Sequence, residues 1–203
     1  MRIEILLAVG CFVATGTVTL RAEPETDPSF PEKAAVAAAA QQFGAALKAE
    51  LLAAMQQGGV TGAVAVCRDR APALARDVSA ETGWTVRRVT LKPRNPDSQP
   101  DGWETAMLKS AEGASSRDPS RKPAESAMRF PADVCTGQSA GTNEVRYLKY
   151  IYIEPVCLAC HGTAIDPAVQ TAISASYPAD QATGYTVGQL RGAISVRGPL
   201  TSP

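Results

Sequence analysis

Residues 144–162 have the sequence EVRYLKYIYIEPVCLACHG, in which a run rich in Tyr, Ile, Val and Leu leads directly into two cysteines and a histidine. The run predicts a β-strand over 144–155, because β-branched and aromatic residues favour extended structure. Cys157, Cys160 and His161 then have the Cys-x-x-Cys-His spacing of c-type haem attachment, in which two thiols bind the porphyrin covalently and the imidazole binds the iron. The stretch therefore predicts a strand that ends at one covalently bound haem c.

Other uses of paired cysteines compete with haem attachment. A zinc ribbon or finger needs four Cys or His ligands, and the chain has no second Cys-x-x-Cys pair and a single histidine. A thioredoxin-like dithiol and a purely structural pair stay open as alternatives. Neither explains the histidine directly after the pair, whereas haem attachment accounts for all three residues.

The first residues predict export. Residues 1–22 carry the apolar stretch ILLAVGCFVATGTVTL, which is followed from residue 21 by the Pro-rich, acidic RAEPETDPSFPEK. This pattern is typical of a secretory signal peptide, which would make 23–32 a linker and the protein periplasmic. A retained N-terminal membrane anchor is the alternative, although the apolar stretch is short for a membrane span and contains Gly and Thr.

Composition indicates one domain over residues 33–203. About 180 residues remain after the leader, enough for a single hydrophobic core. Twenty basic and twenty acidic side chains give a net charge of zero, so nothing indicates a nucleic-acid partner. Aromatic residues make up only 5% of the chain, so we expect a large apolar cofactor to form a considerable part of the core.

The remaining pattern predicts helices first and strands later, which indicates an α+β domain. The Ala-rich residues 33–57 predict a helix that the glycines at 58 and 59 end. Further predicted elements are a helix over 62–81, a strand from Trp84 to about Leu91, a short helix over 103–110, a polar surface loop over 111–126, a short helix before Pro178, and a last strand around Ala193, Ile194 and Val196.

The second axial position of the iron cannot be filled by a histidine of the same chain, because His161 is the only one. The iron could instead bind Met, Cys, Lys, Tyr, an amine or water, or stay five-coordinate. The methionine and cysteine candidates after the leader are Met55, Met107, Met128, Cys67 and Cys135.

Three stretches resemble a bacterial family of c-type haem proteins with a PAS-like fold, long catalogued only as a domain of unknown function. They are VCRDRAPALARDVSAETGWTVRRVTLKPRNPDSQPDGWE, YIYIEPVCLACHG and YPADQATGYTVGQLRGAISV, within a likeness that covers most of residues 33–200. The resemblance implies a PAS-like domain with long N-terminal helices and an antiparallel sheet. It also implies His161 and Cys67 as the axial pair, with an electron-transfer or sensory role. The polar insertion at 111–126 and Cys135 have no match in the family pattern.

A disulfide is the alternative for the upstream cysteine. An exported protein with two further cysteines commonly joins them, so Cys67 could pair with Cys135. If Cys67 binds the iron instead, its thiolate favours the ferric state. Loss of the thiol on reduction would then open a site for a diatomic gas.

Three further residues are candidate haem contacts. Arg88 and Arg94 belong to a basic cluster after Trp84 and could pair with the haem propionates, although such a cluster is often only a solvated face. Tyr152, just before the haem motif, could line the cofactor or simply face the core.

The sequence therefore predicts an exported monohaem c-type cytochrome that transfers electrons or senses redox state or a gas, together with an unidentified redox or signalling partner protein. The alternative is a haem enzyme of the peroxidase or reductase type, which the lack of a second histidine as distal base disfavours. A non-haem interaction module is a third alternative. The sequence leaves the oligomeric state open.

Overall fold

A computed structural model of the chain describes residues 31–118, 122–130 and 143–200. The predictions of a signal peptide over 1–22, of a linker over most of 23–32 and of a role for Cys135 concern residues outside these ranges.

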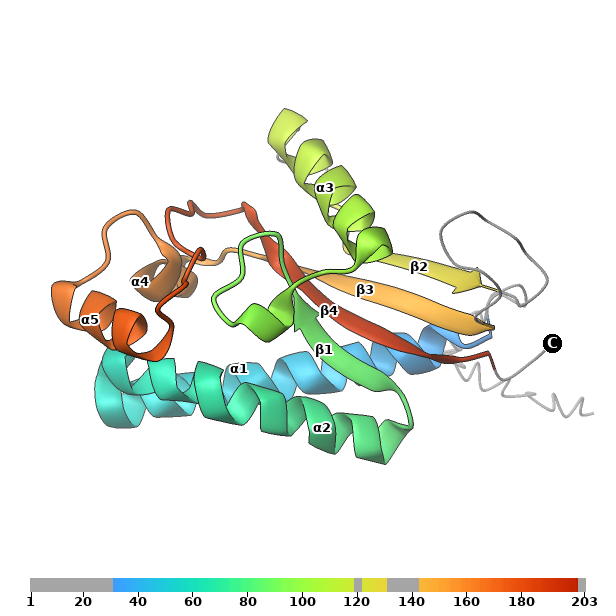
Figure 1. Cartoon of the computed structure of the whole chain (residues 1–203), viewed down its shortest axis with the longest axis horizontal. Coiled ribbons are helices and arrows are strands. Elements are labelled where there is room, and N and C mark those ends of the chain that lie inside the picture. The colour runs from blue at the N-terminus through green and yellow to red at the C-terminus, as the bar shows by residue number, and fades with distance from the viewer. Residues whose placement is uncertain (1–30, 119–121, 131–142, 201–203) are drawn as a thin grey trace, which may run out of the picture.

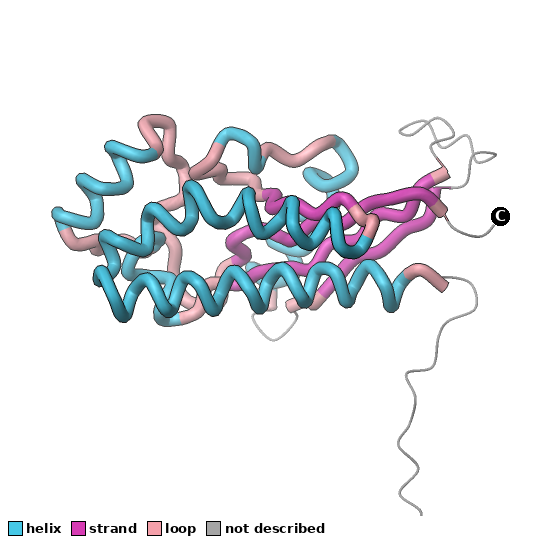
Figure 2. Tube along the Cα trace, turned by 90° about the horizontal axis from the view of Figure 1, so that it is seen from below, coloured by secondary structure: helices cyan, strands magenta, loops and turns pink. Residues whose placement is uncertain are grey.

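The N-terminal helices form an antiparallel pair. Helix α1 (Lys33–Ala65) is interrupted at Gly59, whose φ of 66° and ψ of −170° are not helical, so the predicted helix that ends at the double glycine is confirmed. The chain continues through a π-helical turn, η1 (Val66–Arg70), into α2 (Ala71–Thr82). Gly83 ends α2 in the left-handed conformation, with φ of 76°, which glycine adopts without steric cost. Figure 2 shows α1 and α2 side by side along the sheet.

Four strands form one antiparallel sheet in the order β1-β4-β3-β2. The strands are β1 (Thr85–Val89), β2 (Glu125–Phe130), β3 (Glu144–Tyr152) and β4 (Leu190–Pro199). The predicted strands after Trp84, before the Cys-x-x-Cys-His motif and near the C-terminus are therefore confirmed. The described part of the chain is an α+β domain with a long helical pair and an antiparallel sheet (Figure 1).

The predicted short helix and polar loop after residue 102 are wrong in their extent. Helix α3 (Gly102–Arg117) continues seven residues beyond 110, and β2 begins at Glu125 within the predicted loop. A capping box starts α3, since Asp101 accepts a hydrogen bond from the backbone of Glu104, whose side chain accepts one from the backbone of Asp101. Leu108 and Ala111 are buried against the sheet, so tertiary packing extends a helix that polar composition alone disfavours.

Both faces of the sheet are covered. The core on the α1 and α2 face contains Val36, Ala39, Ala40, Phe43, Val78, Val86, Val145, Tyr147, Ile194 and Val196. On the opposite face α3 packs Leu108 and Ala111 against Val89, Leu148, Tyr150, Leu190 and Ala193. Successive residues of β4 therefore face different cores, as the two-residue period of a strand requires.

Short helices gather at one end of the molecule, next to the part of α1 that follows its interruption at Gly59 (Figure 1). They are α4 (Leu158–His161), which carries the end of the Cys-x-x-Cys-His motif, and α5 (Pro167–Ser176), the predicted helix before Pro178. The 3₁₀ turns η2 (Pro96–Ser98) and η3 (Pro155–Cys157) complete the connections around this end. No helix in the described ranges combines the length and the apolar character needed to cross a membrane.

Candidate functional site

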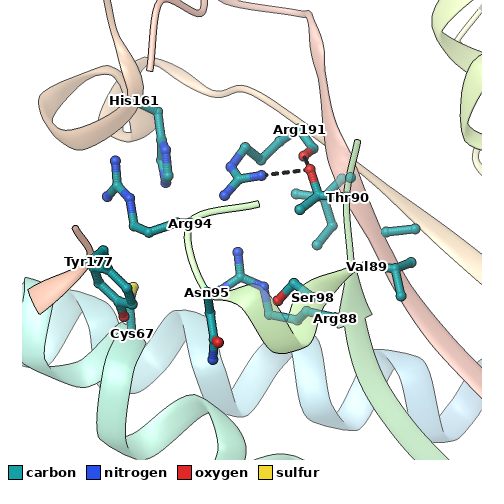
Figure 3. Close-up of a pocket in the computed structure, with 13 residues that line it drawn as sticks. Cys67, Arg88, Val89, Thr90, Arg94, Asn95, Ser98, His161, Tyr177 and Arg191 are labelled. Carbon is teal, nitrogen blue, oxygen red and sulfur yellow. Dashed lines mark hydrogen bonds between the residues drawn. The ribbon is translucent and has the colours of Figure 1, made fainter. Parts of the chain in front are cut away.

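A pocket at this end of the molecule brings together residues that are far apart in the sequence. His161 lies on one side, Cys67 and Tyr177 on another, and three arginines, Arg88, Arg94 and Arg191, surround the space between them (Figure 3). The rest of the lining consists of Val89, Thr90, Asn95, Ser98, Ile151, Gly192 and Ala193. The walls thus come from η1, β1, the loop after β1, β3, α4, the end of α5 and β4.

The imidazole of His161 is held in one tautomer. Its Nδ1 lies 2.6 Å from the backbone oxygen of Ala182, and because a carbonyl oxygen only accepts, Nδ1 donates the hydrogen. Burial, with the positive charges of Arg191 and Arg94, lowers the pKa of His161 to about 2, so the ring is neutral at physiological pH. The lone pair of Nε2 is therefore available to a ligand in the pocket. Metal-binding histidines are usually oriented by the same kind of bond from their other nitrogen.

A buried ion pair fixes the loop that holds His161. The guanidinium of Arg94 donates from Nε and Nη2 to the two carboxylate oxygens of Asp180, at 3.1 Å each. Asp180 also accepts a hydrogen bond of 2.8 Å from the backbone nitrogen of Ala182. Arg94 Nη2 further donates to the backbone oxygen of Cys160 at 2.6 Å. One side chain thus connects the Cys-x-x-Cys-His turn to the loop whose carbonyl orients the imidazole.

Arg191 enters the pocket from a β-bulge. Ile151 pairs with Gly192 and Tyr152 with Leu190, which leaves Arg191 as the extra residue of β4. Bulges of this kind redirect a side chain next to functional sites. Nη1 of Arg191 donates to Thr90 Oγ1 at 2.9 Å, and burial, with the nearby charge of Arg88, lowers the pKa of Arg191 to about 10.

Gly192 lets the bulge approach β1. Its φ is 151°, and a β-carbon at this position would lie 2.4 Å from the backbone oxygen of Val89. Only glycine fits both the conformation and the close contact.

The charge around the pocket is positive and largely unpaired. None of the described residues that line it has a carboxylate side chain, and the guanidinium of Arg88 has no hydrogen-bond or ion-pair partner among the described residues. Two buried polar atoms of the lining, Arg191 Nε and Tyr177 Oη, also find no partner within the described part of the chain. Buried polar groups are nearly always paired, so these groups fit a pocket that receives an anionic, hydrogen-bonding ligand.

Cys67 lies in the π-helical turn between α1 and α2. Single π-turns often occur at functional sites, because they displace one residue from the regular helix face. The thiol is half-buried and forms no disulfide with another described cysteine. Tyr177 shares the same wall of the pocket, and burial raises the pKa of its hydroxyl to about 12.

The two cysteines of the motif lie directly beside the pocket. Cys157 packs against a small cluster of Ile153, Ala182 and Tyr185, and Cys160 packs against the cluster that contains Tyr177. Burial raises the pKa of the Cys160 thiol. No group of three or more His, Cys, Asp or Glu side chains within the described ranges is arranged to hold a metal ion by itself.

Four of the residues singled out in the sequence, Cys67, Arg88, Arg94 and His161, line the pocket, whereas Cys157, Cys160 and Tyr152 do not. Tyr152 is absent from the lining; its hydroxyl donates to the backbone oxygen of Pro123 at 2.9 Å and its ring packs on the α3 face.

Sequence reasoning missed several residues of the site, namely Tyr177, Asp180, Ala182 and Arg191. Arg191 had a detectable signal, because a charged residue within the apolar strand LRGAISV is seldom buried without a function. Asp180 had no such signal, since its partner Arg94 lies 86 positions away.

Comparison with known proteins agrees with this architecture. The crystal structure of the cyanobacterial haem protein Tll0287 matches with a TM-score of 0.53 and 23% identity, over 84% of this chain and 93% of that chain, which shows a shared fold. No curated protein gives a match. The model of the Tll0287-like family matches residues 23–199. The chain therefore belongs to the Tll0287-like family.

Proposed function

We propose that the protein is an exported monohaem c-type cytochrome of PAS-like fold that acts in electron transfer or in redox or gas sensing. Cys157 and Cys160 would hold the haem covalently, and His161 and Cys67 would be the axial ligands of the iron. Three things support the proposal: the Cys-x-x-Cys-His motif, the pocket beside it, and the shared fold with the cyanobacterial haem protein Tll0287.

The observation that carries the proposal is the hydrogen bond from His161 Nδ1 to the oxygen of Ala182. It leaves Nε2 without a proton in a pocket that also contains the thiol of Cys67. An unprotonated imidazole nitrogen and a thiol are both ligands that iron accepts in haem proteins. A core histidine without a ligand would more often use both of its nitrogens within the protein.

The pocket also fits the charge of a haem. A haem carries two propionates, and the pocket presents the guanidiniums of Arg88 and Arg191 with no carboxylate in the lining. Arg191 Nε and Tyr177 Oη, which have no partner within the described residues, could then hydrogen-bond to the bound ligand or to the sulfur of Cys67. Arg94 is already paired with Asp180, so we assign it the role of holding the motif turn and the Ala182 loop.

A bound haem would supply a one-electron couple. The residues of this chain would set how that couple behaves: the Cys67 thiolate favours the ferric state, while the guanidinium charges favour the added electron. Tyr177 is buried and His161 is half-buried, which limits the access of water to the two sides of the pocket. Whether Cys67 stays bound after reduction decides between an electron carrier and a sensor with an open position.

The direct test is expression with the haem-maturation machinery, followed by mass spectrometry and pyridine haemochrome spectra. We expect one haem per chain in the wild type and loss of covalent haem in Cys157→Ser/Cys160→Ser. A fully matured wild-type sample that is colourless and has the mass of the bare polypeptide would refute the proposal.

Electron paramagnetic resonance tests the axial pair. We expect Cys67→Ser to change the ferric low-spin signal, whereas Cys135→Ser, the matched control, leaves it unchanged. The opposite result would contradict the assignment of Cys67. Carbon monoxide added to the ferrous protein then separates the roles, because a carrier refuses the gas and a sensor with a labile thiolate binds it.

A further inference from the structure

A groove on the surface lies next to the pocket, between the C-terminal half of α3 and residues 185–190, which lead into β4. Lys92, Lys109 and Lys122 line it, with Glu112 as the only acidic side chain among its described lining residues. We call it the lysine groove. Val187, at its edge, is 55% exposed, the highest value among the exposed large apolar side chains of the described residues. The lysine groove thus combines an exposed apolar residue with a net positive border.

Tyr185 connects the lysine groove to the pocket. Its ring lies edge-on to the imidazole of His161, with centroids 6.4 Å apart and planes at 90°, and its backbone nitrogen donates to the oxygen of His161 at 2.9 Å. The same side chain is part of the lining of the lysine groove, where Lys92 Nζ lies 5.2 Å from the ring centroid. A single buried aromatic ring therefore separates the predicted iron ligand from a charged surface.

We propose that the lysine groove is the docking surface for an acidic electron-transfer protein, with Tyr185 as the contact between that partner and the haem site. The inference rests on the proposed function, because it needs a haem bound by His161. Three lysines against one glutamate select an anionic surface by charge complementarity. A small patch with one apolar residue and a charged border suits the weak, short-lived complexes of redox partners, which bury little surface.

The test uses the haem-loaded protein and small probes of known charge. Hexacyanocobaltate(III) has the charge of ferricyanide but does not react, so it reports binding alone. We expect it to shift the NMR amide signals of Lys109, Lys122 and Val187. In the redox reaction one electron passes from the reduced protein to ferricyanide, which becomes ferrocyanide, and no proton or other atom is transferred.

The variant Lys109→Gln/Lys122→Gln removes two exposed charges from the lysine groove. We expect the rate with ferricyanide to fall about fivefold at 0.1 M ionic strength, from the screened attraction of a trivalent anion at about 10 Å. The rate with the cation hexaammineruthenium(III) should stay the same or rise. Polyglutamate, as a model of an acidic protein surface, should slow the wild type and have less effect on the variant.

The matched control is Lys33→Gln/Lys149→Gln, which removes the same charge near the start of α1 and from β3. We expect wild-type behaviour with both probes. Equal effects of the two double variants, or hexacyanocobaltate shifts that avoid the lysine groove, would overturn the inference. Failure of the proposed function gives a different result, since a protein without haem would react with neither redox probe.

Discussion

Arg94 and Asp180 offer the sharpest test of how the site is held together. Their side chains are 7% and 10% exposed, and two hydrogen bonds of 3.1 Å join them. Arg94→Met keeps most of the side-chain volume but leaves the Asp180 carboxylate buried without its cation. Removal of one partner of a buried pair usually costs about 3–5 kcal/mol, because the remaining charge has lost its compensation. We therefore expect Arg94→Met to lower the free energy of unfolding by this amount.

A double-mutant cycle separates the ion pair from general packing. Asp180→Asn keeps an oxygen that can accept from the Ala182 nitrogen, but it leaves the Arg94 guanidinium buried without a counter-charge. The double variant contains neither charge, so its loss of stability should be smaller than the sum of the two single losses by about 1–3 kcal/mol. Urea unfolding followed by circular dichroism measures all four proteins. Losses that add to within about 0.5 kcal/mol would refute the reasoning.

The same variant should also disturb His161. Without Arg94, the loop that carries the Ala182 carbonyl loses its connection to the Cys160 backbone, so the imidazole is less firmly oriented. We expect the ferric low-spin resonance of the haem-loaded variant to broaden or shift. Arg76→Met on α2 is the matched control, since the side chain of Arg76 has no hydrogen-bond or ion-pair partner among the described residues. An unchanged resonance in Arg94→Met would mean that other contacts orient His161.

Three further predictions concern the surroundings of the pocket. Gly192→Ala should lower the unfolding free energy by at least about 1–3 kcal/mol in thermal or urea unfolding, because its φ of 151° and the nearby Val89 oxygen exclude a β-carbon; a stable variant would contradict this. Arg191→Met should leave the melting temperature of the haem-free protein unchanged or raise it, since a costly buried cation is lost, but should lower that of the haem-loaded protein; equal shifts in both would argue against a propionate contact. Asp101 has a pKa below its ordinary value of 3.8, because burial, which raises it, is outweighed chiefly by the hydrogen bond from Arg146. The resulting stability is present above pH 3.8 and is lost as the pH falls further, so Asp101→Asn should flatten the acid limb of a plot of stability against pH, and an unchanged limb would contradict this.

Local chemistry determined much of what the sequence could predict. The Cys-x-x-Cys-His spacing defines a site because its three residues are neighbours in the chain, and the consecutive turns η3 and α4 contain all three. The Ala-rich helix and its end at Gly59 also follow from local preferences of the backbone. Arg88 and Arg94 could be named as candidates because they lie in one basic cluster, and both reach the pocket.

Packing between distant segments decided the rest. Helix α3 extends to Arg117 because the sheet buries its apolar side, although its polar sequence alone predicted a loop. Arg191 reaches the pocket because pairing with β3 leaves it in a bulge, and such a register is a property of two strands together. His161 and Cys67 share one pocket because the helical pair turns back along the sheet and brings η1 to the end where α4 lies. The sequence alone determines the residue types and their spacings. The contacts that bring a histidine, a thiol and three guanidiniums into one site form only when the helices pack on the sheet.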